Sequence, residues 1–299
     1  MPVHNGERYV GAAIDAIRSQ TFTDFELIIS DNASTDRTRE ICESHAAADN
    51  RITVVRSATN AGAAANFEKV FALARGEYFK WAAHDDLIAP EWLSRCVEVL
   101  DEDPTTVLCQ TGVLEIDEDG RVVREIRPEL PSVASTDPIT RFADLVLIDH
   151  VCLDVFGLIR SRALRETPRL AGYIASDRVL LAELGLQGRF RQVPDRLFSV
   201  RDHAQRSVRA LPFHKRARWF DSKVRSTRVF PHWRFYKEYF VLVHRVCPRP
   251  SERWRCYGTL CRWPWTNMNW ARLVSDLLIA VWPEASGRLE RSRRAVPAG

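Results

Sequence analysis

The sequence predicts an α/β protein with a mostly parallel β-sheet, helices on both faces of that sheet, and a helical C-terminal appendage. The first observation is an alternation of short apolar runs with segments whose apolar residues recur every three or four positions, over residues 1–100. The second is a Trp- and Arg-rich stretch, residues 212–283, whose prolines separate helical segments. With 299 residues, 45% of them hydrophobic, the chain can form one large domain with an appendage.

The first elements each have a local signal. Residues 1–3 form the last piece of a strand, and the apolar residues of segment 9–17 recur at helical spacing. A compact apolar strand over residues 25–30 ends at Asp31. Ser34 then serves as the N-cap of a helix that reaches about residue 47. Strand and helix therefore already alternate once within the first fifty residues.

The alternation continues to residue 100. Residues 52–55 form a strand, Asn60-Ala61-Gly62 turns the chain, and segment 67–74 has the apolar spacing of a helix. Residues 77–83 are an apolar run that reads as a buried strand, and segment 92–100 carries its apolar residues on one helical face. Elements of this length and order favour parallel strands joined by crossover helices.

Beyond residue 104 strands and helices no longer alternate regularly. The expected elements are strands over 107–116 and 121–126 around a turn at 117–120, a loop over 128–138, a strand over 155–160, a helix over 173–184, and helices after residue 212 broken at Pro231, Pro248, Pro250 and Pro264. A basic end, residues 286–299, follows. We therefore predict a main domain over residues 1–210 and a helical region over 211–299.

Charge is divided unevenly along the chain. Residues 201–299 carry 21 Lys and Arg against 7 Asp and Glu, whereas the whole chain has a formal net charge of only +4. No run reaches the roughly 18 apolar residues that a membrane-spanning helix needs, and the N-terminus lacks the pattern of a secretory signal. Seven scattered cysteines suggest reduced thiols, and the spacing of Cys247, Cys256 and Cys261 matches no common zinc pattern. These observations favour a cytoplasmic protein.

The most informative motif is the acidic pair Asp85-Asp86. It follows the apolar run 77–83 and precedes a helix whose first turn carries Pro90 and Glu91. Carboxylates at the C-terminal end of a strand lie where alternating β/α sheets bind ligands. Two adjacent carboxylates repel each other and suit a shared cation, and oxygen ligands favour Mg²⁺ or Mn²⁺, which can in turn hold a diphosphate. The alternative is that the pair only opens a loop and caps the next helix.

Residues 1–100 resemble, as an ordered series of motifs, a family 2 glycosyltransferase with the nucleotide-binding, Rossmann-like GT-A fold. The pieces that carry the resemblance are the loop Pro2-Val3-His4-Asn5-Gly6-Glu7, the segment Gln20-Thr21-Phe22-Thr23-Asp24-Phe25-Glu26, the loop Asp31-Asn32-Ala33-Ser34-Thr35-Asp36, the turn Asn60-Ala61-Gly62 with Asn66, and Arg75-Gly76-Glu77-Tyr78 leading to Asp85-Asp86. Residues 101–210 match more loosely, and residues 211–299 do not match.

The resemblance implies roles for nine residues. Asp31 would bind the base of a nucleoside diphosphate sugar, Val3 and Glu7 would line the nucleoside pocket, and Asn60 would belong to the donor site. Asp85 would contact the ribose or sugar, Asp86 would bind the divalent metal on the phosphates, and His203 would be a further metal ligand. Asp177 would be the general base, and Arg201 would lie near the donor diphosphate.

This chemistry is coherent on physical grounds. A metal on the phosphates stabilises the leaving group, and a positioned carboxylate can accept the proton of the acceptor hydroxyl. One attack with one base would invert the anomeric centre. Alternatives remain for single residues: Asp31 can simply begin a turn, Asp177 can compensate a helix dipole, and His203 can be a solvated loop residue.

The sequence also departs from the family. Only residues 1–3 remain of the first strand, so we expect added upstream residues to raise the melting temperature; equal stability of both forms would count against this. Ser176 stands where the family usually has Glu before the base. The Gln-x-x-Arg-Trp signature of processive synthases is absent, because Lys215 stands where Gln would be needed before Arg218-Trp219. Addition of single sugars therefore fits better than polymerisation.

The resemblance and the composition also indicate which binding partners to expect. The donor would be a nucleoside diphosphate sugar, and the resemblance implies a glycan or lipid-linked acceptor of the cell envelope. The basic, Trp-rich region 211–299 would pack on the main domain, or part of it would contact an anionic membrane at its inner face. Nucleic acid is disfavoured because no RNA-binding signature accompanies the arginines.

Two other functions stay open. A nucleotidyltransferase would carry a glycine-rich basic loop after the first strand, which His4-Asn5-Gly6-Glu7-Arg8 matches poorly. A degenerate sugar-nucleotide binder or scaffold would bind a donor without turnover.

Overall fold

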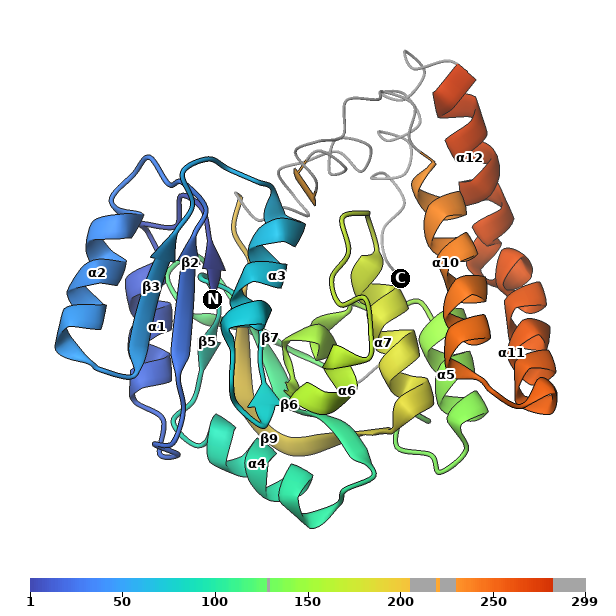
Figure 1. Cartoon of the computed structure of the whole chain (residues 1–299), viewed down its shortest axis with the longest axis horizontal. Helices are drawn as coiled ribbons and strands as arrows, with labels where there is room; N and C mark the ends of the chain where they lie inside the picture. The colour runs from blue at the N-terminus through green and yellow to red at the C-terminus, as the bar shows by residue number, and fades with distance from the viewer. Residues whose placement is uncertain (128–129, 205–218, 221–229, 282–299) are drawn as a thin grey trace.

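The computed structural model describes residues 1–127, 130–204, 219–220 and 230–281 (Figure 1). The predicted basic end, residues 286–299, and the helical prediction for residues 212–218 lie outside the described residues. The described part contains two sheets with helices on both sides and a helical C-terminal region. The predicted α/β class and helical appendage are therefore confirmed.

The first sheet is parallel, as predicted. Its strand order is β1-β2-β3, and Val3 pairs with Asp31, which in turn pairs with Arg56. The strands are β1 (Pro2–Val3), β2 (Leu27–Asp31) and β3 (Ile52–Arg56), and the helices that connect them and follow them are α1 (Val10–Arg18), α2 (Thr38–Ala48) and α3 (Ala63–Leu73). Because parallel strands end at the same edge, the loops after β1 and β2 meet there.

The second sheet is mixed. Its order is β4-β8-β6-β9-β5, with β7 paired to β6; β6 and β9 are parallel and the other pairs are antiparallel. The strands are β4 (Tyr78–Phe79), β5 (Leu87–Ile88), β6 (Thr106–Ile116), β7 (Val122–Ile126), β8 (Leu158–Arg160) and β9 (Arg189–Arg201), and helix α4 (Trp92–Glu102) lies between β5 and β6. Parallel pairing thus prevails in the first sheet only, since periodicity reveals a strand but not its partner.

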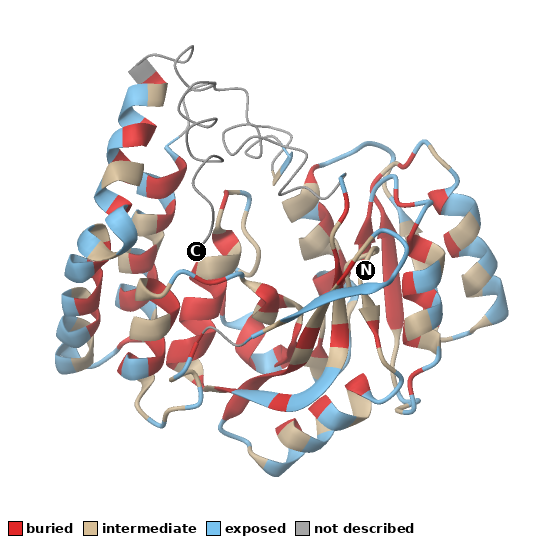
Figure 2. Cartoon of the chain, turned by 180° about the vertical axis from the view of Figure 1, so that it is seen from behind, coloured by how far each residue is buried: buried red, intermediate tan, exposed pale blue. Residues whose placement is uncertain are grey.

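The hydrophobic core lies on both faces of the sheets. Leu27 and Ile29 of β2 pack in a cluster with residues of α1, α2 and α4, whereas Ile28 belongs to a second cluster with residues of α3. Successive side chains of a strand point to opposite faces, which explains this division. Figure 2 shows the buried positions concentrated along the strands and the inner sides of the helices.

Besides the short β5 and the one-turn helix α6 (Ser161–Arg165), two longer elements were not predicted. Helix α5 (Pro138–Leu147) begins after Asp137, whose carboxylate accepts hydrogen bonds from the backbone N–H groups of Ile139 and Thr140. Strand β9 contains Pro194, which cannot donate a ladder hydrogen bond, and the β6–β9 register shifts at Gly112. A Cβ on Gly112 would lie 3.0 Å from the Pro194 carbonyl oxygen, so glycine allows this close approach.

The segment 153–188 also differs in detail from the prediction. The predicted strand 155–160 is a short 3₁₀ turn, η1 (Leu153–Phe156), followed by β8 and helix α6 (Ser161–Arg165). The predicted helix 173–184 is α7 (Ser176–Gln187). It begins three residues late because Ala175 has a left-handed conformation, with φ of +66°.

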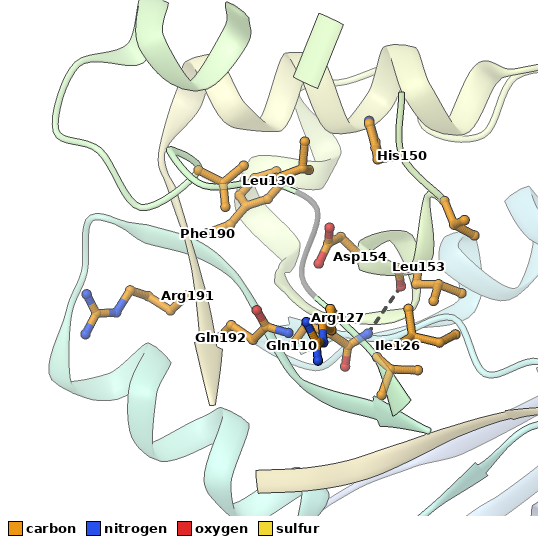
Figure 3. A pocket seen from close by; sticks show the side chains of 13 residues that line it. Gln110, Ile126, Arg127, Leu130, His150, Leu153, Asp154, Phe190, Arg191 and Gln192 are labelled. Carbon is orange, nitrogen blue, oxygen red and sulfur yellow. Dashed lines mark hydrogen bonds between the residues drawn. The ribbon is translucent and has the colours of Figure 1, made fainter. Parts of the chain in front are cut away.

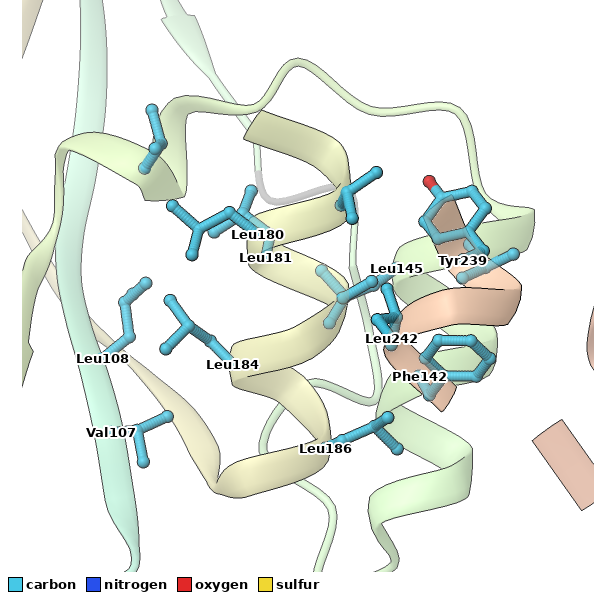
Figure 4. Packing of buried hydrophobic residues seen from close by; sticks show 14 of the residues in the cluster. Val107, Leu108, Phe142, Leu145, Leu180, Leu181, Leu184, Leu186, Tyr239 and Leu242 are labelled. Atoms are coloured by element: carbon cyan, nitrogen blue, oxygen red, sulfur yellow. The ribbon is translucent and has the colours of Figure 1, made fainter. Parts of the chain in front are cut away.

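The C-terminal helices form a further layer on the main domain. Three α-helices follow one another after residue 230: α10 (Pro231–Val246), α11 (Pro250–Arg262) and α12 (Asn269–Val281). A 3₁₀ segment, η3 (Trp263–Met268), joins α11 to α12. Pro231 and Pro250 are the first residues of their helices, which confirms the predicted breaks. Figure 4 shows Tyr239 and Leu242 of α10 packed beside Phe142 and Leu145 of α5.

The cysteines and the hydropathy agree with the sequence prediction. All seven cysteines are free; Cys247 and Cys256 are buried and Cys261 is exposed. Within the described ranges, no helix combines the length and apolar character needed to cross a membrane.

Candidate active site

A cavity of about 610 Å³, here called the main cavity, lies at the carboxyl ends of β1 and β2. Six of the nine predicted site residues line it: Val3, Asn60, Asp85, Asp86, Asp177 and His203. These residues come from segments up to 200 positions apart, so the fold brings most of the predicted site into one space. Glu7, Asp31 and Arg201 are outside the cavity lining.

The end of β9 holds the acidic pair in place. The backbone N–H of Arg201 donates to Asp86 Oδ1 at 2.9 Å, and Arg201 Nε donates to the backbone oxygen of Asp85 at 2.9 Å. Arg201 Nη1 also donates to the carbonyl oxygens of Asp117 and Glu118, at 3.0 and 3.1 Å. Only 4% of Arg201 is exposed. Its guanidinium therefore clamps loop carbonyls, whereas the resemblance placed it near the donor diphosphate.

His203 lies against the other carboxylate. Its Nε2 atom is 2.8 Å from Asp85 Oδ2, and its ring centroid is 5.0 Å from that of Tyr9. Burial raises the pKa of Asp85, but the hydrogen bond from His203 and the charges of His84 and His203 outweigh burial, and the net pKa lies below the ordinary value. Asp85 is therefore ionised at neutral pH. For His203 to bind a metal through Nε2, this hydrogen bond would have to open.

Asp177 faces the same cavity from the start of α7. Its Oδ1 accepts a hydrogen bond from the backbone N–H of Arg178 at 2.9 Å. Burial raises the pKa of Asp177, and the backbone bond and the charge of Arg178 only partly oppose this. A carboxylate with a raised pKa in a cavity is suited to accept a proton.

The side-chain amides of Asn32 and Asn60 hold the predicted nucleoside side of the site together, and we call this pair the amide clasp. Asn32 Nδ2 donates to Asn60 Oδ1 at 2.9 Å, and Asn32 Oδ1 accepts from the backbone N–H of Ala61 at 3.0 Å. Asn60 Oδ1 also accepts from the N–H of Gly62, whose φ of +90° favours glycine. The clasp fixes the turn after β3 against the loop after β2.

Asp31 and Glu7 have structural partners. Asp31 is fully buried; its Oδ1 accepts from the Ser34 N–H at 2.9 Å, and its Oδ2 lies 3.4 Å from Arg56 Nε without a hydrogen bond among the described residues. Glu7 is exposed, and its carboxylate accepts from the backbone N–H of Arg37 at 2.9 Å. For a nucleobase to reach Asp31, the partly exposed Arg56 side chain would have to move.

Lys80 is a neighbour of the site that is not among the predicted site residues. Its Nζ donates to the carbonyl oxygen of Phe156, on the cavity wall, and lies 4.3 Å from the Trp92 ring centroid. Burial lowers the pKa of Lys80 to about 8, partly offset by the negative charge of Asp86. A lysine inside the apolar run 77–83 was the available signal, because charged residues are rarely buried without a partner.

The donor atoms on this wall fit a divalent metal shared with a ligand. Asp85, Asp86 and His203 supply carboxylate oxygens and an imidazole nitrogen, which suit Mn²⁺ or Mg²⁺. In the part of the chain that is described, no three His, Cys, Asp or Glu side chains are grouped to hold a metal ion by themselves. Mg²⁺ is commonly held by one or two carboxylates together with substrate phosphates, so the residues fit a metal completed by a bound diphosphate.

Much of the lining of the main cavity is apolar. Among its larger apolar side chains are those from η1 and its flanks, the loop before α7, helix α3 and a short segment of the C-terminal region: Phe67, Cys152, Leu153, Val155, Phe156, Leu170, Trp219 and Phe220. The rings of Trp219 and Phe220 meet edge to face at 4.9 Å. The lining of the cavity thus combines the acidic pair and Asp177 with many apolar side chains.

A second, smaller cavity of about 60 Å³ lies on the other side of residues 151–153 (Figure 3). Gln110 Nε2 donates to the Leu153 carbonyl oxygen at 3.2 Å within it. Buried His150 also lines it, and burial lowers the pKa of His150 to about 4. This volume admits only a few water molecules and contains no predicted site residue.

Comparisons with known proteins agree with this geometry. The family model for glycosyl transferase family 2 matches residues 1–167. EpsE of Bacillus subtilis is 34% identical over 132 residues, which cover 44% of this chain and 48% of EpsE. The chain spans about half the length of the first curated relatives that it matches.

Two solved structures show the same fold. S. aureus TarS in complex with UDP-GlcNAc has a TM-score of 0.62 and 17% identity, covering 88% of this chain and 69% of that chain. The mannosyltransferase PcManGT of Pyrobaculum calidifontis, solved with GDP-Man and Mn²⁺, has a TM-score of 0.52 and 15% identity, covering 95% of this chain and 86% of that one.

Proposed function

The chain belongs to glycosyl transferase family 2, and from that premise we propose that it transfers a sugar from a nucleoside diphosphate sugar to a hydroxyl acceptor, with inversion and with help from a divalent metal. The observation that carries the proposal is the meeting of Asp85, Asp86 and Asp177 in one cavity of about 610 Å³. That volume lies within the range of small-molecule sites. Carboxylates for phosphate chemistry and for proton transfer thus line one enclosed space.

The proposed reaction is a single displacement. The acceptor hydroxyl loses its proton to the Asp177 carboxylate while its oxygen forms a bond to the anomeric carbon. The bond between that carbon and the diphosphate oxygen breaks, and the electron pair leaves with the nucleoside diphosphate. Because attack and departure occur on opposite faces, the anomeric configuration inverts. The raised pKa of Asp177 supports this role, since a more basic carboxylate accepts the proton more readily.

The acidic pair would serve the diphosphate. When bound, a divalent cation would neutralise charge that develops on the leaving group. Asp86, with Asp85 and His203, would hold that cation, and Arg201 would keep the pair oriented through its bonds to Asp86 Oδ1 and to the Asp85 carbonyl oxygen. The Mn²⁺ in the fold-related PcManGT supports the metal.

Val3 and Asn60 would line the donor pocket in this proposal, and Asp31 would read the base after Arg56 moves aside. Glu7, which lies outside the cavity lining, would support the donor loop through its bond to the Arg37 N–H. UDP-GlcNAc in TarS and GDP-Man in PcManGT support a nucleotide-sugar donor.

We propose a glycan or lipid-linked acceptor of the cell envelope. The apolar lining residues Phe156, Leu170 and Trp219 support an acceptor that presents apolar surface or a sugar face in the cavity that Asp177 also lines. The proposal includes a cytoplasmic location with peripheral contact at the inner face of the membrane. Its support is the basic character of residues 201–299, with 21 Lys and Arg against 7 Asp and Glu.

The test is thermal stabilisation by UDP, GDP, dTDP and CDP, each with and without Mn²⁺. One diphosphate is expected to raise the melting temperature in an Mn²⁺-dependent way, since a ligand at 100 times its Kd adds about 2.7 kcal/mol. Asp86→Asn is expected to abolish the shift, and Asp119→Asn, on the exposed turn after β6, should retain it. No shift with any diphosphate would contradict the proposal.

Turnover separates an enzyme from a degenerate binder or scaffold. The matching sugar nucleotide, incubated with candidate acceptors and Mn²⁺, should release nucleoside diphosphate in the wild type and much less in Asp177→Asn. Binding without release would favour the binder. Release of pyrophosphate from a nucleoside triphosphate and a sugar phosphate would favour a nucleotidyltransferase.

A further inference from the structure

Helix α12 exposes a continuous apolar stripe. Trp270, Val274, Leu277 and Leu278 are between 44% and 52% exposed. Their spacing of four, three and one residues puts them within an arc of about 100° on an α-helix. Leu273, next to the edge of this arc, is buried and belongs to the core cluster that contains residues of α10. We call the four exposed residues the α12 stripe.

The stripe carries no charge. The charged residues of α12 are Arg272, which bonds to Asp149 of the main domain, and Asp276, which is buried against His232 of α10. A contiguous exposed apolar surface of this kind is unusual on a monomeric soluble protein and marks a contact site. Figure 1 places α12 at the margin of the molecule, and Figure 2 shows exposed positions along it.

The segment that leads into α12 also exposes apolar side chains. Trp265 and Met268, in the 3₁₀ segment directly before the helix, are 78% and 61% exposed. Tryptophan is enriched where proteins meet the headgroup region of bilayers, because its ring is apolar and its N–H is polar. The same chemistry recurs on α11, where Trp254 is 73% exposed.

The charge around the stripe favours one partner. Residues 230–281, which form the C-terminal helices, carry eight Lys and Arg against three Asp and Glu. Arg234, Lys237, Arg249, Arg255 and Arg262 are exposed on α10, α11 and the residue before α11, although Arg234, Arg249 and Arg255 each pair with a carboxylate. Two copies of this chain would bring like charges together, which opposes association. An anionic lipid surface would instead attract them, by about 1 kcal/mol per basic residue near the membrane.

We propose that the α12 stripe is the contact surface for an anionic lipid bilayer. The apolar side chains and Trp270 would enter the headgroup boundary, while the neighbouring arginines contact lipid phosphates. This specifies the surface for the proposed membrane contact, and it does not depend on the chemistry of the main cavity. A failure here would leave diphosphate binding untouched, so the two proposals fail separately.

The experiment is vesicle flotation of the full chain at low salt. One set of vesicles contains phosphatidylcholine with phosphatidylglycerol, and the other contains phosphatidylcholine alone. The protein is expected to float with the anionic vesicles and to remain behind with the neutral ones. Raising NaCl to 0.5 M should release most of it, because exposed charges are screened.

Two matched variants isolate the stripe. Leu277→Ser with Leu278→Ser removes apolar surface without changing charge, and is expected to weaken anionic-vesicle partitioning on the order of tenfold. Val122→Ser with Val123→Ser, an exposed aliphatic pair on β7 at 61% and 58% exposure, should partition like the wild type. Circular dichroism and melting temperature confirm that both variants fold.

Three results would overturn the proposal. The first is a wild type that does not float with anionic vesicles at low salt. The second is a Leu277→Ser/Leu278→Ser variant that floats as well as the wild type. The third is sedimentation of the wild type as a dimer that this variant converts to a monomer, which would assign the stripe to an interface between two copies.

Discussion

An ion pair between a buried glutamate and an arginine whose side chain is 40% exposed joins the C-terminal layer to the helix that begins with Ser176 and Asp177. Arg245 of α10 contacts Glu183 of α7 through Nη2–Oε2 at 2.6 Å and Nε–Oε1 at 3.2 Å, and Glu183 is fully buried. Burial raises the pKa of Glu183, and Arg245 only partly opposes it. Arg245→Met should therefore leave a carboxylate that must be either buried as an unpaired charge or protonated.

Protonation of Glu183 limits how much stability the Arg245→Met variant loses. Leaving a buried charge unpaired costs about 3–5 kcal/mol. Protonating a carboxyl whose ordinary pKa is 4.5 costs about 3.4 kcal/mol at pH 7 and about 0.7 kcal/mol at pH 5, at 1.36 kcal/mol per pH unit. The folded variant takes whichever of these two routes costs less free energy. Arg245→Met should therefore lower the free energy of unfolding by about 3 kcal/mol at pH 7 and about 1 kcal/mol at pH 5.

The sign of the pH dependence follows from proton binding. In the variant, the pKa of Glu183 is higher in the folded than in the unfolded state, so the folded state binds more protons and stability falls as pH rises above 4.5. Urea unfolding at pH 5 and pH 7 measures both values. Replacing the pair together, Glu183→Leu with Arg245→Met, should recover most of the loss, because no charge then remains buried.

Arg249→Met is the matched control. Arg249 is 78% exposed at its side chain and pairs with Glu252 on the same helix, so its loss should change stability by less than about 0.5 kcal/mol. An Arg245→Met loss that is equal at pH 5 and pH 7, or below about 1 kcal/mol at pH 7, would refute the reasoning.

Outcomes are expected for four further variants. Asp177→Asn should keep donor binding but slow transfer by about 10²–10⁴-fold, and the wild-type rate should fall as pH drops through the raised pKa of Asp177; an unchanged rate would remove it as the base. Gly62→Ala should cost about 1–3 kcal/mol, because φ of +90° and ψ of 166° suit glycine alone. Gly258→Ala, with open space around its Cα, should instead stabilise α11 by about 0.5–1 kcal/mol in the same unfolding assay. The pKa of Lys80 is about 8 in the folded state and 10.5 ordinarily, so the unfolded state binds more protons between these two pH values. The free energy of unfolding of the wild type should therefore rise by up to about 3 kcal/mol as the pH increases over this range. Lys80→Met should not show this rise, and equal pH profiles for both proteins would contradict the prediction.

The elements that were predicted well depend on near neighbours in the chain. Strand β2 is a compact apolar run that ends at Asp31, and α1 has an apolar face with a regular helical repeat. Pro231 and Pro250 start helices because the missing N–H is not needed in the first turn. Each of these signals is complete within about ten residues, so one sequence is enough to read it.

The missed elements depend on distant partners. Strand β9 contains Pro194 and many exposed residues, and its order comes from parallel pairing with β6, about 80 positions earlier. Helix α5 had a local signal in the Asp137 cap, but its apolar face is defined by contacts with α7 and α10. The mixed pairing of the second sheet likewise follows from which strands meet, which periodicity does not encode.

For the site, the sequence by itself determined the chemical groups and their local settings: an acidic pair after an apolar run, an aspartate that ends a parallel strand, and an acid in the first turn of α7. Only the tertiary structure decided what each group faces. It turned Arg201 inward onto the Asp85 carbonyl oxygen, joined His203 to Asp85 across 118 positions, and buried Asp31 with its Oδ2 atom 3.4 Å from Arg56 Nε. Residue type and strand ends are written in adjacent positions, whereas hydrogen-bond partners and burial arise from contacts between segments that meet only when the chain folds.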